Sequence, residues 1–151
     1  MSVRLSKPDA DAGDVLAELD ATCAVAGWSV SAYRAILQSR LWDCRIAMLE
    51  GRPVGYYVSR VLPPEVELMT IGVIPAEQGR GLGKLLLDEC LAEAVSRGCR
   101  RCFLEVRRSN HRAIRFYQGN GFVTCFVRRG YYVNPGEDAL VFERRLERPI
   151  G

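Results

Sequence analysis

Residues 68–87 read LMTIGVIPAEQGRGLGKLLL, and this stretch decides the fold. The apolar run before Pro75 is typical of a strand that ends there. Three glycines then fall within five residues, at Gly79, Gly81 and Gly83. The leucine-rich run that follows predicts a helix beginning directly after the loop. The stretch is therefore a strand–loop–helix unit.

This loop has the chemistry of an anion site. Glycines let the backbone curl with its N–H groups pointing inward, and no Cβ blocks close approach. The first turn of a helix leaves N–H groups unpaired, and the helix dipole adds positive potential there. Arg80 and Lys84 bring two cations to the same place. A pyrophosphate suits such a site, although a tight turn alone would also explain the glycines.

Two other glycine-rich loops fit this sequence less well. A Walker loop needs four residues between its glycines and a Ser or Thr after Gly-Lys, whereas Leu85 follows Lys84 here. A dinucleotide-binding fold needs an acidic residue about twenty positions further on, and Glu105 stands near that distance. The order Gly-x-Gly-x-Gly differs from the dinucleotide pattern, however, and the strands before the loop form a hairpin.

The rest of the chain alternates strands and helices around this unit. Expected strands cover residues 3–6, 45–49, 54–62, 65–74, 101–106, 121–128 and 139–146. Expected helices run from Pro8–Asp9 to about 25, from a cap at Ser29 or Ser31, over 82–97, and from a cap at Ser109–Asn110 to 119 or 120. We expect an α/β fold in a single domain over residues 1–151. Its central mixed sheet would have six to seven strands, with helices on both faces.

Composition narrows the function. Apolar residues make up 48% of the chain and the net charge is +3, with both signs spread along the sequence. That balance argues against a nucleic-acid binder. Arginines do gather at residues 107–115 and 128–129, either as a solvated surface or as a landing zone for an anionic cofactor or acidic partner. We see no apolar run long enough for a signal peptide or a membrane span, so we expect a cytoplasmic protein that does not bind membranes.

The six cysteines are expected to be reduced thiols without a metal. Cys99 and Cys102 form a lone CxxC pair, and the single histidine is His111. A zinc site would need a second pair of ligands, and a redox pair would need its first cysteine at a helix N-terminus. With no secretory signal, disulfides are not expected either.

Several motifs together resemble the GNAT acetyltransferases. They are Gln78-x-x-Gly81-x-Gly83, residues 104–110, 113–117, 121–122, 128–132 and 137–139, and Trp28-Ser29. The full set is similar to the RimI-like branch, which acetylates the N-terminal alanine of a small-subunit ribosomal protein. The resemblance spans residues 28–146, and its C-terminal half is the specific part.

The resemblance implies acetyl-CoA as co-substrate. Backbone groups of Ile71, Gly72 and Val73 would hydrogen-bond the pantetheine arm in a gap between splayed strands. The pyrophosphate would lie against the loop residues Gln78, Gly79, Arg80, Gly81, Leu82, Gly83 and Lys84. Asn110 would also contact the cofactor, a role compatible with capping the following helix.

The resemblance also implies a catalytic pair, Glu105 and Tyr117. Glu105 interrupts an apolar strand, where burial would make the carboxylate a stronger proton acceptor for the attacking amine. A salt-bridged strand residue is the alternative. Tyr117 would protonate the departing thiolate, and a core aromatic beside Phe116 is its alternative. We expect direct transfer, because no cysteine stands beside a histidine in the motif.

The acceptor substrate is the part of the function that the sequence constrains least. By resemblance Trp28, Tyr33, Tyr131 and Tyr132 would line an acceptor groove, although core packing or a surface contact explains each equally well. Gly130 and the loop at residues 134–136 depart from the family pattern. We expect N-terminal acetylation of a protein, such as a ribosomal protein with an alanine-like first residue. A small amine such as a polyamine or antibiotic, or a module that binds CoA or nucleic acid without catalysis, are the alternatives.

Overall fold

The structure is a computed structural model that describes residues 2–147. The ends of the predicted domain, Met1 and residues 148–151, lie outside the described residues. The elements are β1 (Val3–Ser6), α1 (Gly13–Cys23), α2 (Val30–Leu37), β2 (Trp42–Leu49), β3 (Arg52–Leu62), β4 (Glu65–Val73), the 3-10 helix η1 (Pro75–Glu77), α3 (Leu82–Ser96), β5 (Arg101–Arg107), α4 (His111–Gly119), β6 (Val123–Tyr132) and β7 (Glu137–Arg145).

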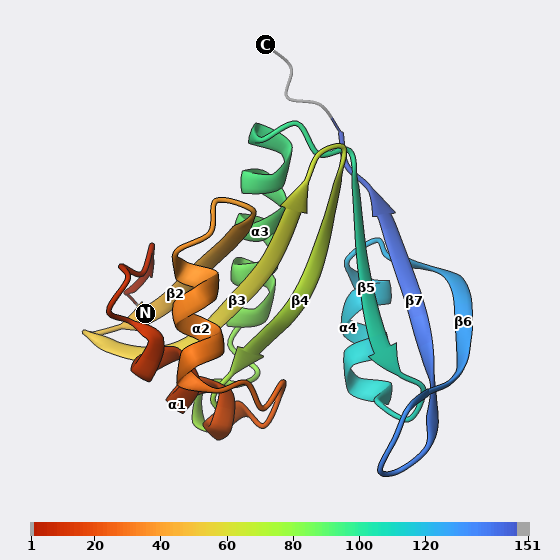
Figure 1. Cartoon of the computed structure of the whole chain (residues 1–151), viewed down its shortest axis with the longest axis horizontal. Helices are drawn as coiled ribbons and strands as arrows, with labels where there is room; N and C mark the ends of the chain where they lie inside the picture. The colour runs from red at the N-terminus through yellow and green to blue at the C-terminus, as the bar shows by residue number, and fades with distance from the viewer. Residues whose placement is uncertain (1, 148–151) are drawn as a thin grey trace.

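The strands form one seven-stranded mixed sheet in the order β1-β2-β3-β4-β5-β7-β6. Among the strands of residues 2–147, only β4 and β5 pair in parallel, and α3 makes the crossover between them. α1 and α2 cover one face over β2, β3 and β4, while α3 and α4 lie behind the sheet (Figure 1). The predicted α/β class, the mixed sheet and the helices on both faces are confirmed.

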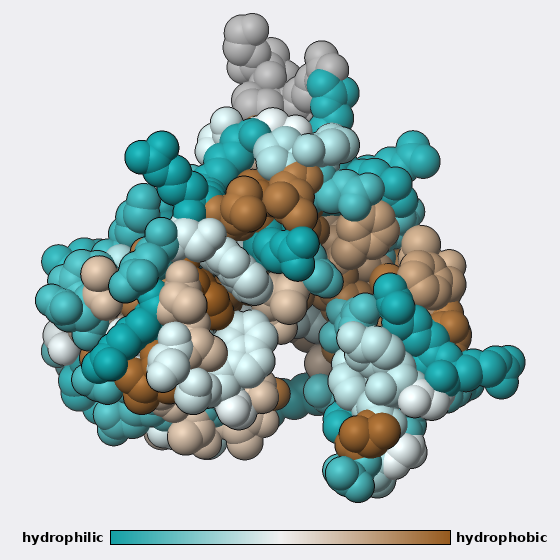
Figure 2. Space-filling model, viewed as in Figure 1, coloured by the Kyte–Doolittle hydropathy of each residue, from teal (hydrophilic) through white to brown (hydrophobic). Residues whose placement is uncertain are grey.

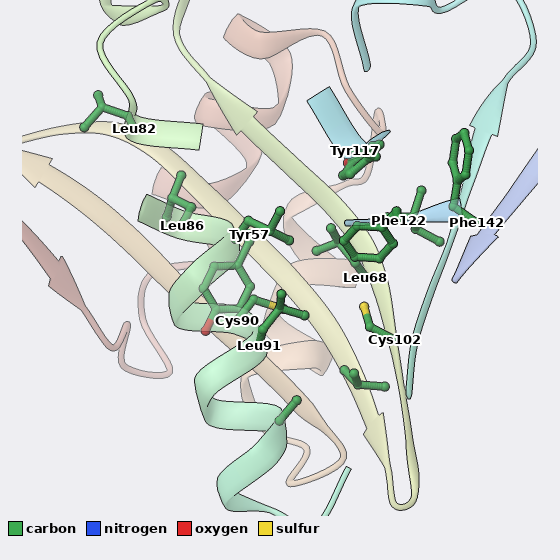
Figure 3. Close-up of a cluster of buried hydrophobic side chains, with 14 of the residues drawn as sticks. Tyr57, Leu68, Leu82, Leu86, Cys90, Leu91, Cys102, Tyr117, Phe122 and Phe142 are labelled. Atoms are coloured by element: carbon green, nitrogen blue, oxygen red, sulfur yellow. The ribbon is translucent and has the colours of Figure 1, made fainter. Parts of the chain in front are cut away.

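The larger core lies between the sheet and the helices α3 and α4. Leu86, Cys90 and Leu91 of α3 pack beside Tyr57 and Leu68 of the sheet (Figure 3). Each buried leucine contributes roughly 1.5–3 kcal/mol by leaving water. Cys99 and Cys102, the CxxC pair, are buried as separate free thiols in this same cluster. The core thus fixes the start of α3, which carries the glycine loop.

Helix caps and element ends show how well the local sequence predicts where helices and strands begin and end. Ser29, and not Ser31, caps α2 by accepting from Ala32 N at 3.1 Å. α1 begins at Gly13 instead of Asp9, because Asp9 forms a turn in which its carboxylate accepts the N–H of Asp11 at 2.9 Å. β6 extends beyond the predicted residue 128, since pairing with β7 continues to Tyr132.

Among residues 2–147, no helix has both the length and the apolar character that a membrane span requires.

A β-bulge in β4 marks the point where β4 leaves β5. The register between β3 and β4 shifts between Val58 and Ser59, which leaves Met69 as the extra residue. Pairing of β4 with β5 joins only residues 65–67 to residues 101–103. Beyond these pairs the two strands separate (Figure 1). The resulting gap is the place where the candidate site forms.

Candidate active site

Two cavities meet at the gap between β4 and β5. One, of about 540 Å³, lies at the glycine loop and α4, and the other, of about 430 Å³, lies between the α1–α2 loop and the β6–β7 hairpin. Val25 and Asn110 line both cavities, so the two adjoin at these residues. Figure 2 shows the hollow between the two halves of the molecule. We call the cavity at the glycine loop the loop cavity, and the cavity beside the β6–β7 hairpin the hairpin cavity.

The glycine loop has the geometry of an anion nest. Gly79 and Gly81 have φ of +80° and +82°, and an added Cβ at either would meet no protein atom within 4 Å. Gly81 is the N-cap of α3 and provides no side-chain cap, which leaves the first N–H groups of the helix to a ligand. Gly83 differs, because a Cβ there would contact the ring of Phe116 at 3.5 Å. Only the first two glycines are therefore required by backbone conformation.

The two cations of the loop are engaged with neighbouring carboxylates. Arg80 Nη1 lies 3.3 Å from Glu77 Oε2, and Lys84 Nζ donates to Asp88 Oδ2 at 2.8 Å. Lys84 still lines the loop cavity, whereas Arg80 does not. The Arg80 guanidinium is turned towards Glu77, and the role of Arg80 in the pyrophosphate loop stays a prediction.

The other predicted cofactor residues all line the loop cavity. They are Ile71, Gly72, Val73, Gln78, Gly79, Gly81, Leu82, Gly83, Lys84 and Asn110. Gly72 also allows close packing, since a Cβ there would come within 2.9 Å of Cys23 Cβ on α1. Asn110 caps α4 by accepting from Ala113 N at 3.2 Å. The structure brings together both walls of the predicted cofactor site.

Tyr117 lies at the inner end of the loop cavity. Its ring packs against Phe116, Phe122 and Phe142, with centroids 5.3, 5.6 and 6.4 Å away. Burial, and then the nearby thiols of Cys102 and Cys90, raise the pKa of the Tyr117 hydroxyl well above its usual range. The side chain is thus both a core aromatic and a lining group that holds its proton firmly.

Glu105 lies in the hairpin cavity, on the other side of the gap. Its Oε1 is 3.2 Å from Arg128 Nε on β6, and its side chain is 23% exposed. The expected burial is only partial, because this face of β5 has no covering helix. The carboxylate also raises the pKa of Tyr131, chiefly by a hydrogen bond and then by its charge. Glu105 is therefore ion-paired and also faces the cavity, and its role as the base stays a prediction.

Glu67 is a second carboxylate in the hairpin cavity that the sequence did not reveal. It lies on β4 two residues before the bulge at Met69 and lines the same cavity as Glu105. Burial, and then the negative charge of Glu105, raise the pKa of Glu67. No local motif marks this residue, since its proximity to Glu105 depends on the parallel pairing of β4 with β5.

The predicted acceptor aromatics divide into two groups. Trp28, Tyr131 and Tyr132 line the hairpin cavity, and Arg107 stacks over the ring of Tyr132 at 4.2 Å. Tyr33 does not line it: this residue of α2 has a fully buried side chain, and its ring centroid lies 5.6 Å from that of Trp28. The prediction that Tyr33 contacts the acceptor is therefore wrong.

Tyr33 instead belongs to a hydrogen-bonded clamp centred on Asp20, another residue that sequence reasoning missed. The buried Asp20 carboxylate accepts the Tyr33 hydroxyl at 2.6 Å and the N–H groups of Ala26, Gly27 and Trp28 at 3.0, 2.7 and 2.9 Å. Burial raises the pKa of Asp20, but these hydrogen bonds outweigh it and leave the pKa lowered. The clamp fixes the α1–α2 loop, which supplies one wall of the hairpin cavity.

Loss of this clamp should be measurable as instability. We expect Asp20→Asn to lower the free energy of unfolding by about 2 kcal/mol, because an amide cannot accept from all four donors. Urea denaturation checks this, with the exposed Asp14→Asn on the same helix as control. Since the folded pKa of Asp20 is lowered, its contribution is present above the unfolded pKa near ~4 and is lost as pH falls through the folded value. Equal stability of the two variants would show that Asp20 is dispensable.

The opposite wall is pinned by Glu137 at the start of β7. Its carboxylate accepts the N–H of Ser109, and its Oε2 lies 3.3 Å from Arg107 Nη1. These contacts, led by the hydrogen bond from Ser109, lower the pKa of Glu137. The hairpin that carries Tyr131 and Tyr132 is thereby tied to the turn between β5 and α4.

Comparisons with known proteins agree with this geometry. The model of the acetyltransferase (GNAT) family matches residues 14–122. The [ribosomal protein bS18]-alanine N-acetyltransferase of Escherichia coli K12 is 32% identical over 116 residues, which cover 76% of this chain and 78% of that protein. Its Salmonella typhimurium LT2 counterpart is 37% identical over 94 residues, or 61% of this chain and 64% of that protein, slightly under two thirds. The crystal structure of the E. coli ribosomal-protein-S18-alanine N-acetyltransferase superposes with a TM-score of 0.88 at 26% identity, covering 99% of this chain and 97% of that one.

Proposed function

This chain belongs to the GNAT family of acetyltransferases, and from that premise we propose that it acetylates the N-terminal α-amine of a protein whose first residue is small. The acetyl donor would be acetyl-CoA and the transfer direct. One observation carries the proposal: the loop cavity and the hairpin cavity meet at the β4–β5 gap, with Tyr117 on one side and Glu105 on the other. A donor and an acceptor that enter from opposite sides would meet there.

Acetyl-CoA would occupy the loop cavity. The N–H groups from Gly79 to the first turn of α3 would hold its pyrophosphate, and the unpaired edge of β4 at Ile71–Val73 would hold the pantetheine arm. The positive φ at Gly81 fits this role, because glycine adopts it without strain and lets the loop curl its N–H groups towards a ligand. Bound acetyl-CoA supplies the thioester carbonyl that the amine attacks.

The proton of the amine would pass to Glu105. An α-ammonium has a pKa near ~8, so at neutral pH one proton must leave before attack. Attack would form the N–C bond, and collapse of the tetrahedral adduct would then break the C–S bond and release CoA as a thiolate. The nitrogen would lose a second proton as the amide forms, which balances the proton that the thiolate takes up. Tyr117, which its raised pKa keeps protonated at neutral pH, would donate its proton to that sulfur. Arg128 would orient the Glu105 carboxylate through their 3.2 Å ion pair.

The acceptor preference should appear in kcat/KM measured over a panel of peptides. We expect Ala- and Ser-initiated peptides to exceed Met- and Leu-initiated ones by roughly tenfold or more, because a large first residue displaces the amine from the carbonyl. Tyr132→Ala should erode this ranking more than it changes CoA affinity, since Tyr132 lines only the hairpin cavity. Val133→Ala, on the same hairpin but 72% exposed, is the control.

A small-molecule amine remains the second candidate, and the same panel decides between them. Spermidine and an aminoglycoside should be poorer substrates than the best peptide, because Trp28, Tyr131 and Tyr132 offer aromatic walls to a peptide. If either amine exceeds every peptide in kcat/KM, the N-terminal acceptor is wrong and the acetyltransferase assignment stands alone.

A further inference from the structure

Arg112 is a cationic group of the loop cavity that the proposed roles leave unused. It lies in the first turn of α4 and faces the glycine loop from the opposite wall. Arg80 and Lys84, on the loop side, already have carboxylate partners in Glu77 and Asp88. Among residues 2–147 no carboxylate forms an ion pair with Arg112, so its positive charge is not neutralised by the protein.

A strap formed by Gln78 holds Arg112 across the cavity. Gln78 Nε2 donates to Val73 O at the end of β4 at 3.0 Å, and its Oε1 accepts from Arg112 Nη1. The guanidinium is thus bound to a neutral amide, which orients it without cancelling its charge. Through these two hydrogen bonds the Gln78 side chain joins the end of β4 to α4 beside the glycine loop.

A guanidinium placed in this way suits a phosphate monoester. Arginine offers a planar fork that can bind two phosphate oxygens, and its hydrogen bonds to an anion are strong ones. The pyrophosphate of CoA already has the N–H groups of the loop and of α3 as partners. The next anion along the CoA molecule is the 3′-phosphate on its ribose, beyond the pyrophosphate and away from the thioester.

We infer that Arg112, oriented by Gln78, forms a subsite for the 3′-phosphate of CoA and makes the protein discriminate CoA from dephospho-CoA. The inference rests on the proposed use of acetyl-CoA. It goes further, because it assigns the discrimination between CoA and dephospho-CoA to a residue of α4. The glycine-loop motif does not include α4. An acyl carrier that has only the phosphate of its phosphopantetheine group, and no 3′-phosphate, would lack the contact with Arg112.

Calorimetric titration of the free protein with CoA and with dephospho-CoA tests the subsite. We expect the wild type to bind CoA roughly tenfold more tightly than dephospho-CoA, the scale of one charge-assisted hydrogen bond. Arg112→Gln should lose that difference by weakening CoA and leaving dephospho-CoA unchanged. The loss should shrink at high salt, because the side chain is exposed. Arg115→Gln, an exposed arginine on the same helix that does not line the cavity, should behave as wild type.

The other outcomes each decide the question. Equal weakening of both ligands in Arg112→Gln would place the contact on the pyrophosphate and overturn the subsite. Unchanged CoA affinity in the variant, or no discrimination by the wild type, would overturn it too while leaving acetyl-CoA as donor. If the wild type binds neither ligand, the proposed cofactor itself fails, and this inference fails with it.

Discussion

Replacing Glu105 by glutamine should slow turnover by roughly 10²-fold at neutral pH, the scale expected for loss of a general base. Glutamine has the same shape but cannot accept the proton of the ammonium group. The loss should shrink as pH rises past ~8, because the amine then deprotonates in solution. CoA affinity should stay near wild type, since Glu105 lines the hairpin cavity and not the loop cavity. A pH–rate profile for both proteins, together with calorimetry, measures these effects.

Two further variants show whether the effect belongs to Glu105. Glu67→Gln removes the neighbouring carboxylate of the same cavity and should cost less activity than Glu105→Gln. The exposed Glu18→Gln on α1 should match wild type. A larger loss in Glu67→Gln would make Glu67 the proton acceptor. A wild-type rate in Glu105→Gln would reduce Glu105 to the partner of Arg128. Loss of that partly exposed ion pair should change stability by less than about 1 kcal/mol.

Gly81→Val should weaken CoA binding by about 100-fold, equivalent to about 2.7 kcal/mol. A β-branched residue at a φ of +82° is strained by roughly 1–3 kcal/mol, and the loop can relieve that strain only by leaving the conformation that presents its N–H groups. Calorimetric titration with CoA measures the loss.

The chain provides a matched control for backbone strain at Gly51. This glycine lies in the turn between β2 and β3, has a φ of +79°, and an added Cβ there would also meet nothing within 4 Å. Gly51→Val should therefore destabilise the fold about as much as Gly81→Val does, while leaving CoA affinity unchanged. If folded Gly81→Val binds CoA as tightly as wild type, the loop is not the pyrophosphate site.

The sequence by itself determined those features that depend on near neighbours in the chain. The glycine order between Pro75 and Leu82 predicted a nest at the start of α3, because positive φ and uncapped N–H groups are local properties. Ser29 and Asn110 were recognisable as candidate caps for the same reason. The order of strands and helices followed from apolar periodicity, with errors confined to element ends such as the start of α1.

Only the tertiary structure decided which side chains face the site. A side chain on a strand points to one face or the other, and the single extra residue at Met69 reverses that alternation without a sign in the sequence. The separation of β4 from β5 then opens the gap, and the parallel pairing before it places Glu67 near Glu105. Tyr33 became a core residue because α1 supplies Asp20 beneath it, and Arg112 faces the loop because α4 packs across from α3. Such contacts join residues far apart in the chain, so they follow from packing and not from local pattern.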